Sequence, residues 1–236
     1  MPRKYLGPLQ PGKRTAMVPR RRPAAKKVST KSITSLIKKV SLAQVETRRS
    51  AFYGEGSDLL HNTTQYYGGL LNTTVGTNNP DGANHYPGQR IGSEIIAKAI
   101  NFKFYLERQS SNSSSHFKVI VFRYPSHNFT LNDGNFWQGG SGSGANNILR
   151  IIDTIAINKI TVLKQFIVRP NDQLTKELNF YIPLRNKKIV YNDNSSVTPK
   201  DFNIGFAIVG CDKIGDATTS KIGELNYAWK MTYKDP

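Results

Sequence analysis

The chain has 236 residues, of which 38% are hydrophobic and 10% aromatic, and its formal net charge is +17. This length holds one large domain or two small ones, and this hydrophobic content is sufficient for a folded core. The single cysteine, Cys211, excludes an internal disulfide framework and a multi-cysteine zinc site. The N-terminus lacks the apolar stretch of a signal peptide, and no run of about eighteen apolar residues occurs. We therefore expect a protein made in the cytosol that spans no membrane.

The positive charge is concentrated at the N-terminus. The first fifty residues contain fourteen Lys or Arg and one acid, Glu46, whereas residues 51–236 contain nineteen basic and fifteen acidic residues. The net charges of the two parts are thus +13 and +4. So many like charges repel one another and are costly to bury, and a polyanion that releases counterions is their natural partner. The predicted nucleic-acid-binding residues are Arg3, Lys4, Lys13, Arg14, Arg20, Arg21, Arg22, Lys26, Lys27, Lys31, Lys38 and Lys39.

Residues 1–28 are rich in Pro, Arg and Lys and show no apolar periodicity, which predicts an arm that is disordered until it is bound. A compact basic cluster inside the arm also has the composition of a nuclear-import signal. The other interpretation is a run of charge that only binds phosphate, and one cluster could serve both purposes. The predicted import residues are Arg20, Arg21, Arg22, Lys26 and Lys27.

Residues 29–46 have the pattern of a short amphipathic helix. Its apolar residues fall at i, i+3, i+4 and i+7 and form one stripe: Ile33, Leu36, Ile37 and Val40. A stripe this narrow on a short helix is not stable alone, so it needs a partner, either its own domain or other copies of the chain. A helix lying on a membrane surface is the alternative, but no aromatic anchor accompanies the stripe.

From residue 47 onward, strand signals alternate with loops rich in Gly, Ser, Asn and Pro. Two of the runs are apolar on both faces, as expected of central strands, and short helical turns fit at 131–138 or 146–153. Weaker strand signals lie near 50–55 and 67–72. The clear strands are predicted at 94–107, 116–123 (apolar on both faces), 160–168 (also apolar on both faces), 175–182, 202–211 and 224–233.

Eight strands without alternating helices predict two packed antiparallel sheets. The connections between the strands are too long for a simple meander and suit Greek-key crossings. We therefore expect residues 47–236 to form an all-β, eight-stranded antiparallel jelly-roll sandwich, with an immunoglobulin-like sandwich as the alternative.

No catalytic constellation is recognisable. The Gly-rich stretch at 139–147 lacks the Gly-Lys-Ser/Thr ending of a phosphate-binding loop, and no Gly-x-Ser-x-Gly elbow is present. The four histidines show no metal-ligand spacing: His61, His85, His116 and His127. We expect no enzymatic activity, no catalytic residue and no cofactor. The acidic stretches at 191–196 and 211–216 fit either solvated loops or part of a Ca²⁺ site between subunits, and no metal ligand is assigned.

Arm, helix and sandwich, in this order, resemble the satellite tobacco necrosis virus-like capsid proteins. This set includes coat proteins of circular Rep-encoding single-stranded DNA (CRESS-DNA) viruses. Two motifs are the most specific parts of this resemblance. The first is Gly-x-Arg-x-Gly leading into a long strand. The second is Phe-Tyr-Ile-x-Leu-x-Asn followed by a short Ile-Val-Tyr strand, which is similar to that family's return hairpin. The segments that carry the resemblance are 29–52, 88–107, 116–125, 157–168 and 176–192.

The resemblance implies a capsid protein that assembles with itself into a sixty-subunit, T=1 icosahedral shell with the basic arm inside. It implies two four-stranded sheets and helices that meet at a threefold axis through Ile33, Leu36, Ile37 and Val40. Plant satellite viruses can hold Ca²⁺ at subunit contacts, but no ligand can be carried over to this chain. The expected locations are the virion and the host nucleus and cytoplasm, with a host import receptor as a further partner.

The resemblance leaves the genome type open between RNA and single-stranded DNA. The long basic arm and the import-like cluster favour DNA. The alternative from another class is a cellular nucleic-acid-binding β-domain with a basic tail, which would be monomeric when free and would spread its charge over the folded surface. A carbohydrate-binding jelly roll would explain the fold but would leave the arm without a role.

Overall fold

A computed structural model describes residues 33–37, 40, 47–75, 85–86, 89–112, 114–138, 154–170, 174–193, 196–212 and 220–235. The chain divides into two compact units, residues 1–39 and residues 40–236. In the first unit, residues 33–37 are helical, as the apolar stripe predicts. The predicted disorder of residues 1–28, the Gly-rich stretch at 139–147 and the helical turn at 146–153 lie outside the described residues.

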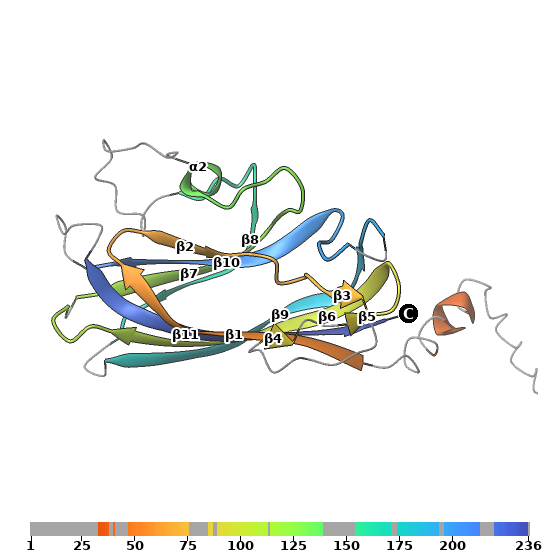
Figure 1. The fold of residues 1–236 in the computed structure, drawn as a ribbon, viewed down its shortest axis with the longest axis horizontal. Coiled ribbons are helices and arrows are strands. Elements are labelled where there is room, and N and C mark those ends of the chain that lie inside the picture. Colours follow the sequence, from red (N-terminus) through yellow and green to blue (C-terminus); the bar gives the residue numbers. More distant parts are fainter. Residues whose placement is uncertain are drawn as a thin grey trace, which may run out of the picture. The chain divides into compact units, whose positions relative to one another are not determined.

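The second unit is built from two large antiparallel sheets, which Figure 1 shows as two layers. The five-stranded sheet contains, in spatial order, β4 (His85–Tyr86), β1 (Thr47–Leu60), β11 (Lys221–Lys234), β6 (Glu94–Arg108) and β9 (Thr175–Val190). The four-stranded sheet contains β2 (Thr64–Tyr67), β10 (Phe202–Cys211), β7 (His116–Pro125) and β8 (Thr161–Val168). A small parallel pair joins β3 (Thr74–Val75) to β5 (Gln89–Arg90).

The strand order is that of a jelly roll. Leaving aside the short β4, the first four strands of the two large sheets pair with the last four in reverse order: β1 with β11, β2 with β10, β6 with β9, and β7 with β8. The β11–β6 and β10–β7 pairs then join these hairpin arms into the two sheets. Two Greek keys wrapped in this way define the jelly roll and exclude the immunoglobulin-like alternative.

Alternation along the strands places the core between the two sheets. On β6, Phe102 and Phe104 are buried whereas Lys103 between them is exposed, because successive side chains point to opposite faces. Phe206 of β10 enters from the facing sheet, with its ring centroid 4.9 Å from that of Phe104. A row of aromatic residues in register crosses the five-stranded sheet on the core side: Phe52, Trp229, Phe102 and Phe180.

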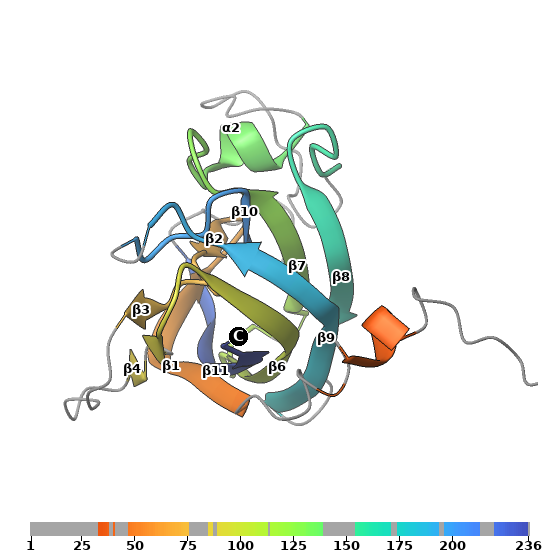
Figure 2. The same cartoon turned by 90° about the vertical axis from the view of Figure 1, so that its right-hand side faces the viewer.

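The outer face of the four-stranded sheet is also covered. The connection from β7 to β8 contains the short helix α2 (Asp133–Phe136), which lies outside that sheet in Figure 2. Phe136 packs against Phe122 of β7 at 4.9 Å between ring centroids. Cover on both faces explains why β7 and β10 are buried along most of their length, and α2 lies within the predicted helical turn at 131–138.

Two predicted strands differ from the structure. The segment 160–168 was expected to be central, but β8 is an edge strand, and Ile167 is 60% exposed. A short apolar run indicates a strand without saying how many of its faces are covered. The strand expected at 67–72 instead ends at Tyr67, because Gly68 and Gly69 follow and Gly69 has φ +77°, a left-handed conformation that does not continue a strand.

The resemblance also implied a return hairpin within residues 176–192, which is not formed. β9 continues as one strand to Val190 and stays paired with β6. The pairing register of β6 and β9 shifts between Ala97, which pairs with Lys187, and Ala99, which pairs with Pro183. Arg185 and Asn186 have positive φ values of 53° and 57° and absorb the additional residues. A bulge therefore takes the place of the predicted turn.

Candidate functional site

All twelve predicted nucleic-acid-binding residues, including the five of the import cluster, lie outside the described residues. Their roles remain predictions. The first basic residues in the described part of the chain are Arg48 and Arg49, which follow Thr47 at the start of β1.

Arg48 and Arg49 have different environments. The Nη1 atom of Arg48 donates to the carbonyl oxygen of Gln89 at 3.0 Å and lies 3.4 Å from Oδ2 of Asp235. Arg49, on the opposite face of β1, is exposed. Arg48 therefore holds the first residues of the sheet in place, and Arg49 is the arginine that remains accessible to a ligand.

The predicted helix stripe is an exposed apolar surface. Its four side chains are between 47% and 63% exposed, and all four residues are helical: Ile33, Leu36, Ile37 and Val40. Isolated exposed apolar residues are common on protein surfaces, but Ile33, Leu36 and Ile37 recur at helical spacing within one short helical segment, a pattern suited to packing. The threefold contact stays a prediction.

A buried guanidinium lies at one end of the sandwich. Arg90 of β5 is fully buried and donates to the carbonyl oxygens of Gly92, Asp193 and Ser196, the Asp193 oxygen at 3.2 Å. Burial lowers the pKa of Arg90 from its usual value. The side chain connects β5 to the loop after β9. Sequence reasoning missed it because arginine is nearly always exposed.

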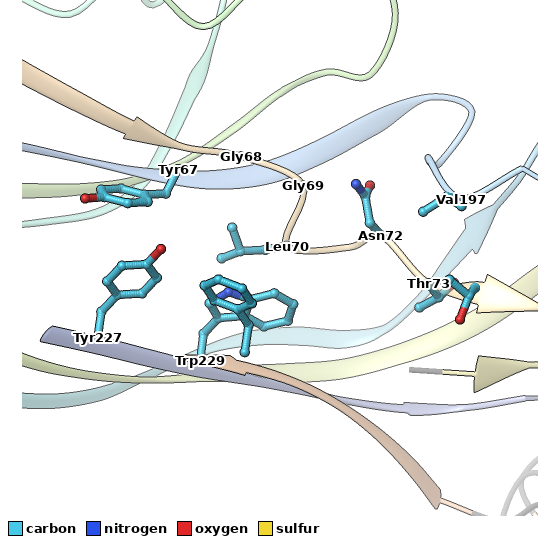
Figure 3. A pocket seen from close by; sticks show the side chains of 11 residues that line it. Tyr67, Gly68, Gly69, Leu70, Asn72, Thr73, Val197, Tyr227 and Trp229 are labelled. Atoms are coloured by element: carbon cyan, nitrogen blue, oxygen red, sulfur yellow. The ribbon is translucent and has the colours of Figure 1, made fainter. Parts of the chain in front are cut away.

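A cavity of about 350 Å³ opens between the two sheets, beside β1 and β2. Figure 3 shows Tyr67 and Leu70 on one side of it, and Tyr227 and Trp229 on the other. The ring centroids of Tyr67 and Tyr227 lie 4.7 Å apart. Burial raises the pKa of both phenols, that of Tyr227 to about 12. The cavity is suited to apolar packing and offers no acid–base pair.

The described residues hold no group of three His, Cys, Asp or Glu side chains that could bind a metal ion. In the acidic stretch at 191–196, Asp193 accepts a hydrogen bond from the backbone N–H of Ser196 at 2.6 Å, which is a loop contact. His61 is buried, and its Nδ1 accepts from the backbone N–H of Asp212 at 3.2 Å. Cys211 is buried, and it forms no disulfide bond within the described residues. Within the described segments, no helix is long and apolar enough to cross a membrane.

No protein-family model and no curated protein matches the chain. Among solved structures, the chain has a distant similarity to VP1 of Trichodysplasia spinulosa-associated polyomavirus. The structure of VP1 with sialylated precision glycooligomers has 9% sequence identity and a TM-score of 0.13, over 80% of this chain and 71% of VP1. VP1 alone has 8% identity and a TM-score of 0.13, over 81% and 76%. At these TM-scores the similarity carries no argument, and the jelly-roll assignment depends on strand order.

Proposed function

We infer that the protein is a viral capsid protein that assembles with itself into a closed shell around a nucleic acid. The segregation of charge carries this proposal, since residues 1–50 have a net charge of +13 and the remaining 186 residues only +4. A jelly roll with a basic arm at one end can place its domain in a shell and its arm on a polyanion inside. A cellular nucleic-acid-binding domain would instead spread its charge over the folded surface.

Two features of the described residues support the proposal of assembly. The apolar stripe at Ile33, Leu36, Ile37 and Val40 is exposed, and Ile167 on the edge strand β8 is exposed as well. Such surfaces favour contacts between copies, and contacts related by closed rotations generate a finite shell. Sixty copies, the smallest icosahedral arrangement, give T=1 symmetry.

Electron micrographs of the purified recombinant protein test the proposal. We expect uniform particles about 20 nm across, roughly the size that sixty domains of this length enclose. A protein that stays monomeric over a range of salt and pH, yet binds nucleic acid, would contradict the capsid function and favour the cellular nucleic-acid-binding alternative.

The packaged genome is proposed to be single-stranded, with circular DNA favoured over RNA. Sixty arms at +13 supply about 780 positive charges, enough to offset roughly 780 phosphates. A genome of about one to two kilobases would be neutralised only in part by the arms, and Mg²⁺ or polyamines would supply the remainder. Nuclease treatment of nucleic acid extracted from particles distinguishes DNA from RNA.

The arm is also proposed to direct the protein to the host nucleus through an import receptor, and the mature protein to reside in the virion. Support comes from the five clustered residues Arg20, Arg21, Arg22, Lys26 and Lys27. A fluorescent protein fused to residues 1–30 should concentrate in nuclei, and alanine at all five positions should abolish this. A cytoplasmic signal from the unmutated fusion would contradict import.

A further inference from the structure

The two large sheets differ in how their outer faces are covered. Phe136 and Trp137 bury the outer face of the four-stranded sheet, whereas the outer face of β11 and β6 carries exposed side chains among the described residues. Side chains on this second face, such as Asn101, Lys103 and Lys230, are accordingly exposed. This face is a broad surface on which a ligand can lie.

Two neighbouring rows of residues form a shallow depression on this face. One row contains Lys230, Asn101 and Tyr181 in register, and the next contains Ala228, Lys103 and Asn179. They line a depression of about 640 Å³, with the small Ala228 among larger side chains. Tyr181 is 60% exposed, so an aromatic side chain is accessible to a ligand on this face.

Basic and acidic side chains occupy different rows of this face. The two rows of the depression contain lysines and no acid, and neither Lys103 nor Lys230 forms an ion pair within the described part of the chain. Acids appear in the rows beyond, where Glu177 faces Tyr105 and Glu107 faces Glu224. At the boundary between the basic and acidic rows, Nδ2 of Asn179 donates to Oε1 of Glu177 at 2.7 Å. The depression is thus complementary to an anion, and the opposite end of the face is not.

The basic rows continue toward the start of β1. Arg49 is exposed on the same face, and Lys98 reaches Thr47, its Nζ donating to Oγ1 at 3.2 Å. The depression begins two residues further along β1, about 7 Å away at the usual rise of a strand. Residues 1–46, with twelve basic side chains, join the domain at Thr47. In the sequence, these basic residues therefore lead directly into the end of β1 that carries Arg49.

We propose that this sheet face binds single-stranded nucleic acid, with a base stacked on Tyr181 and phosphates against Lys103 and Lys230. Exposed aromatic rings and nearby cations are the usual elements of sequence-tolerant single-strand binding. The amides of Asn101 and Asn179 lie beside the ring and can donate to base edges. The inference rests on the proposed function, which supplies the single-stranded genome as ligand.

The test uses the full-length protein and a dT₃₀ oligonucleotide that contains one 5-iododeoxyuridine. Ultraviolet cross-linking and peptide mapping should place an adduct on Tyr181. Tyr181→Thr should abolish that adduct and weaken binding about five- to 150-fold, the range for losing one stacked base. Tyr181→Phe should retain both the cross-linked adduct and the binding affinity. Tyr105→Thr is the matched control, because Tyr105 is an exposed tyrosine on the same face beside Glu177, and it should change neither.

The salt dependence of binding distinguishes the contribution of the two lysines from that of the Tyr181 ring. Replacing Lys103 and Lys230 by alanine should reduce the slope of log affinity against log salt by about 1.4, or about 0.7 per charge on a single strand, while Tyr181→Thr should leave the slope unchanged. Cross-links confined to the arm, or equal affinity for duplex and single strand, would overturn the inference. So would a Tyr181→Thr variant that assembles differently but binds dT₃₀ normally, since that indicates a contact between subunits. Particle formation, scored separately, tests the capsid function itself.

Discussion

The guanidinium carbon of Arg90 lies 3.9 Å from the centroid of the Tyr191 ring, and both side chains are buried. The hydroxyl of Tyr191 in turn donates to the carbonyl oxygen of Leu71 at 2.7 Å. One stacked pair therefore connects β5, the segment before β3 and the loop after β9. A cation over an aromatic ring is worth most where water is excluded, as it is here.

Replacing Arg90 by methionine should lower the free energy of unfolding by about 3 kcal/mol. The variant keeps the apolar stem but leaves the carbonyl oxygens of Gly92, Asp193 and Ser196 without their donor. The measurement is urea unfolding followed by tryptophan fluorescence. Arg169→Met, at an exposed arginine, is the control and should stay within about 0.5 kcal/mol of wild type. An equally small change for Arg90→Met would show that the network does not stabilise the fold.

Stability should fall in alkaline solution. Burial raises the pKa of Tyr191 and Tyr227 to about 12, and it also raises that of Tyr233. The folded protein thus holds these protons more tightly than the unfolded chain, whose phenols titrate near pH 10. Their contribution is fully present below about pH 10 and is lost as the pH rises toward 12, with a slope of up to about 1.4 kcal/mol per pH unit for each group.

Urea midpoints measured from pH 8 to 12 check this dependence. Tyr191→Phe should be less stable than wild type at pH 8, because it lacks the hydrogen bond to Leu71, but its stability should decline less steeply above pH 10. Parallel curves for the two proteins would mean that Tyr191 ionises in the folded state as it does in the unfolded chain.

Gly223 should not tolerate a methyl group. A Cβ atom on this β11 residue would overlap the carbonyl oxygen of Glu107 on β6 and would lie 2.9 Å from Cζ of Phe117. Backbone cannot move aside cheaply, so Gly223→Ala should destabilise the domain by about 1–3 kcal/mol. Gly92→Ala is the matched control because nothing lies within 4 Å of the added atom. Thermal unfolding of the two variants measures the difference, and equal melting temperatures would contradict the close packing of β11 on β6.

The helix stripe should be needed for assembly and not for folding. Replacing Leu36 and Ile37 by aspartate would bury two unpaired charges at each contact between copies, at several kcal/mol each. We expect particle yield to collapse while the unfolding curve of the jelly roll is retained. Thr34→Asp with Ser35→Asp adds the same charges to the same helix off the stripe and should assemble. Equal yields from both double variants and wild type would show that the helix makes no contact.

The arm should bind the genome through charge without reading sequence. Up to Val45 it contains twelve basic residues, no acid and one aromatic residue, Tyr5. Reading base edges requires a fixed element that presents side chains in register. Deleting residues 1–27 should sharply lower the packaged nucleic acid and flatten the salt dependence of binding, whereas scrambling them at constant composition should change little. Equal losses from deletion and scrambling would require specific recognition by the arm.

Much of the fold could be predicted because its signals are local. Alternation in β6 identifies a strand with one wet face, and the absence of long helical periodicity identifies an all-β domain. The charge difference between residues 1–50 and the remainder is likewise a property of the sequence alone. These features determined the class of fold and the expectation of a polyanionic partner.

The tertiary structure decided which strands lie at an edge and which faces are covered. Runs 116–123 and 160–168 look alike in sequence, yet β7 is central and β8 is an edge strand, because their neighbours come from distant parts of the chain. Tyr181 and Phe180 are adjacent aromatic residues, but only Tyr181 faces outward beside Lys230 and Asn101. Arg90 is buried for the same reason, since two of its three carbonyl acceptors lie on a distant segment, at separations of 103 and 106 residues. Burial depends on such long-range pairing, which no local pattern encodes.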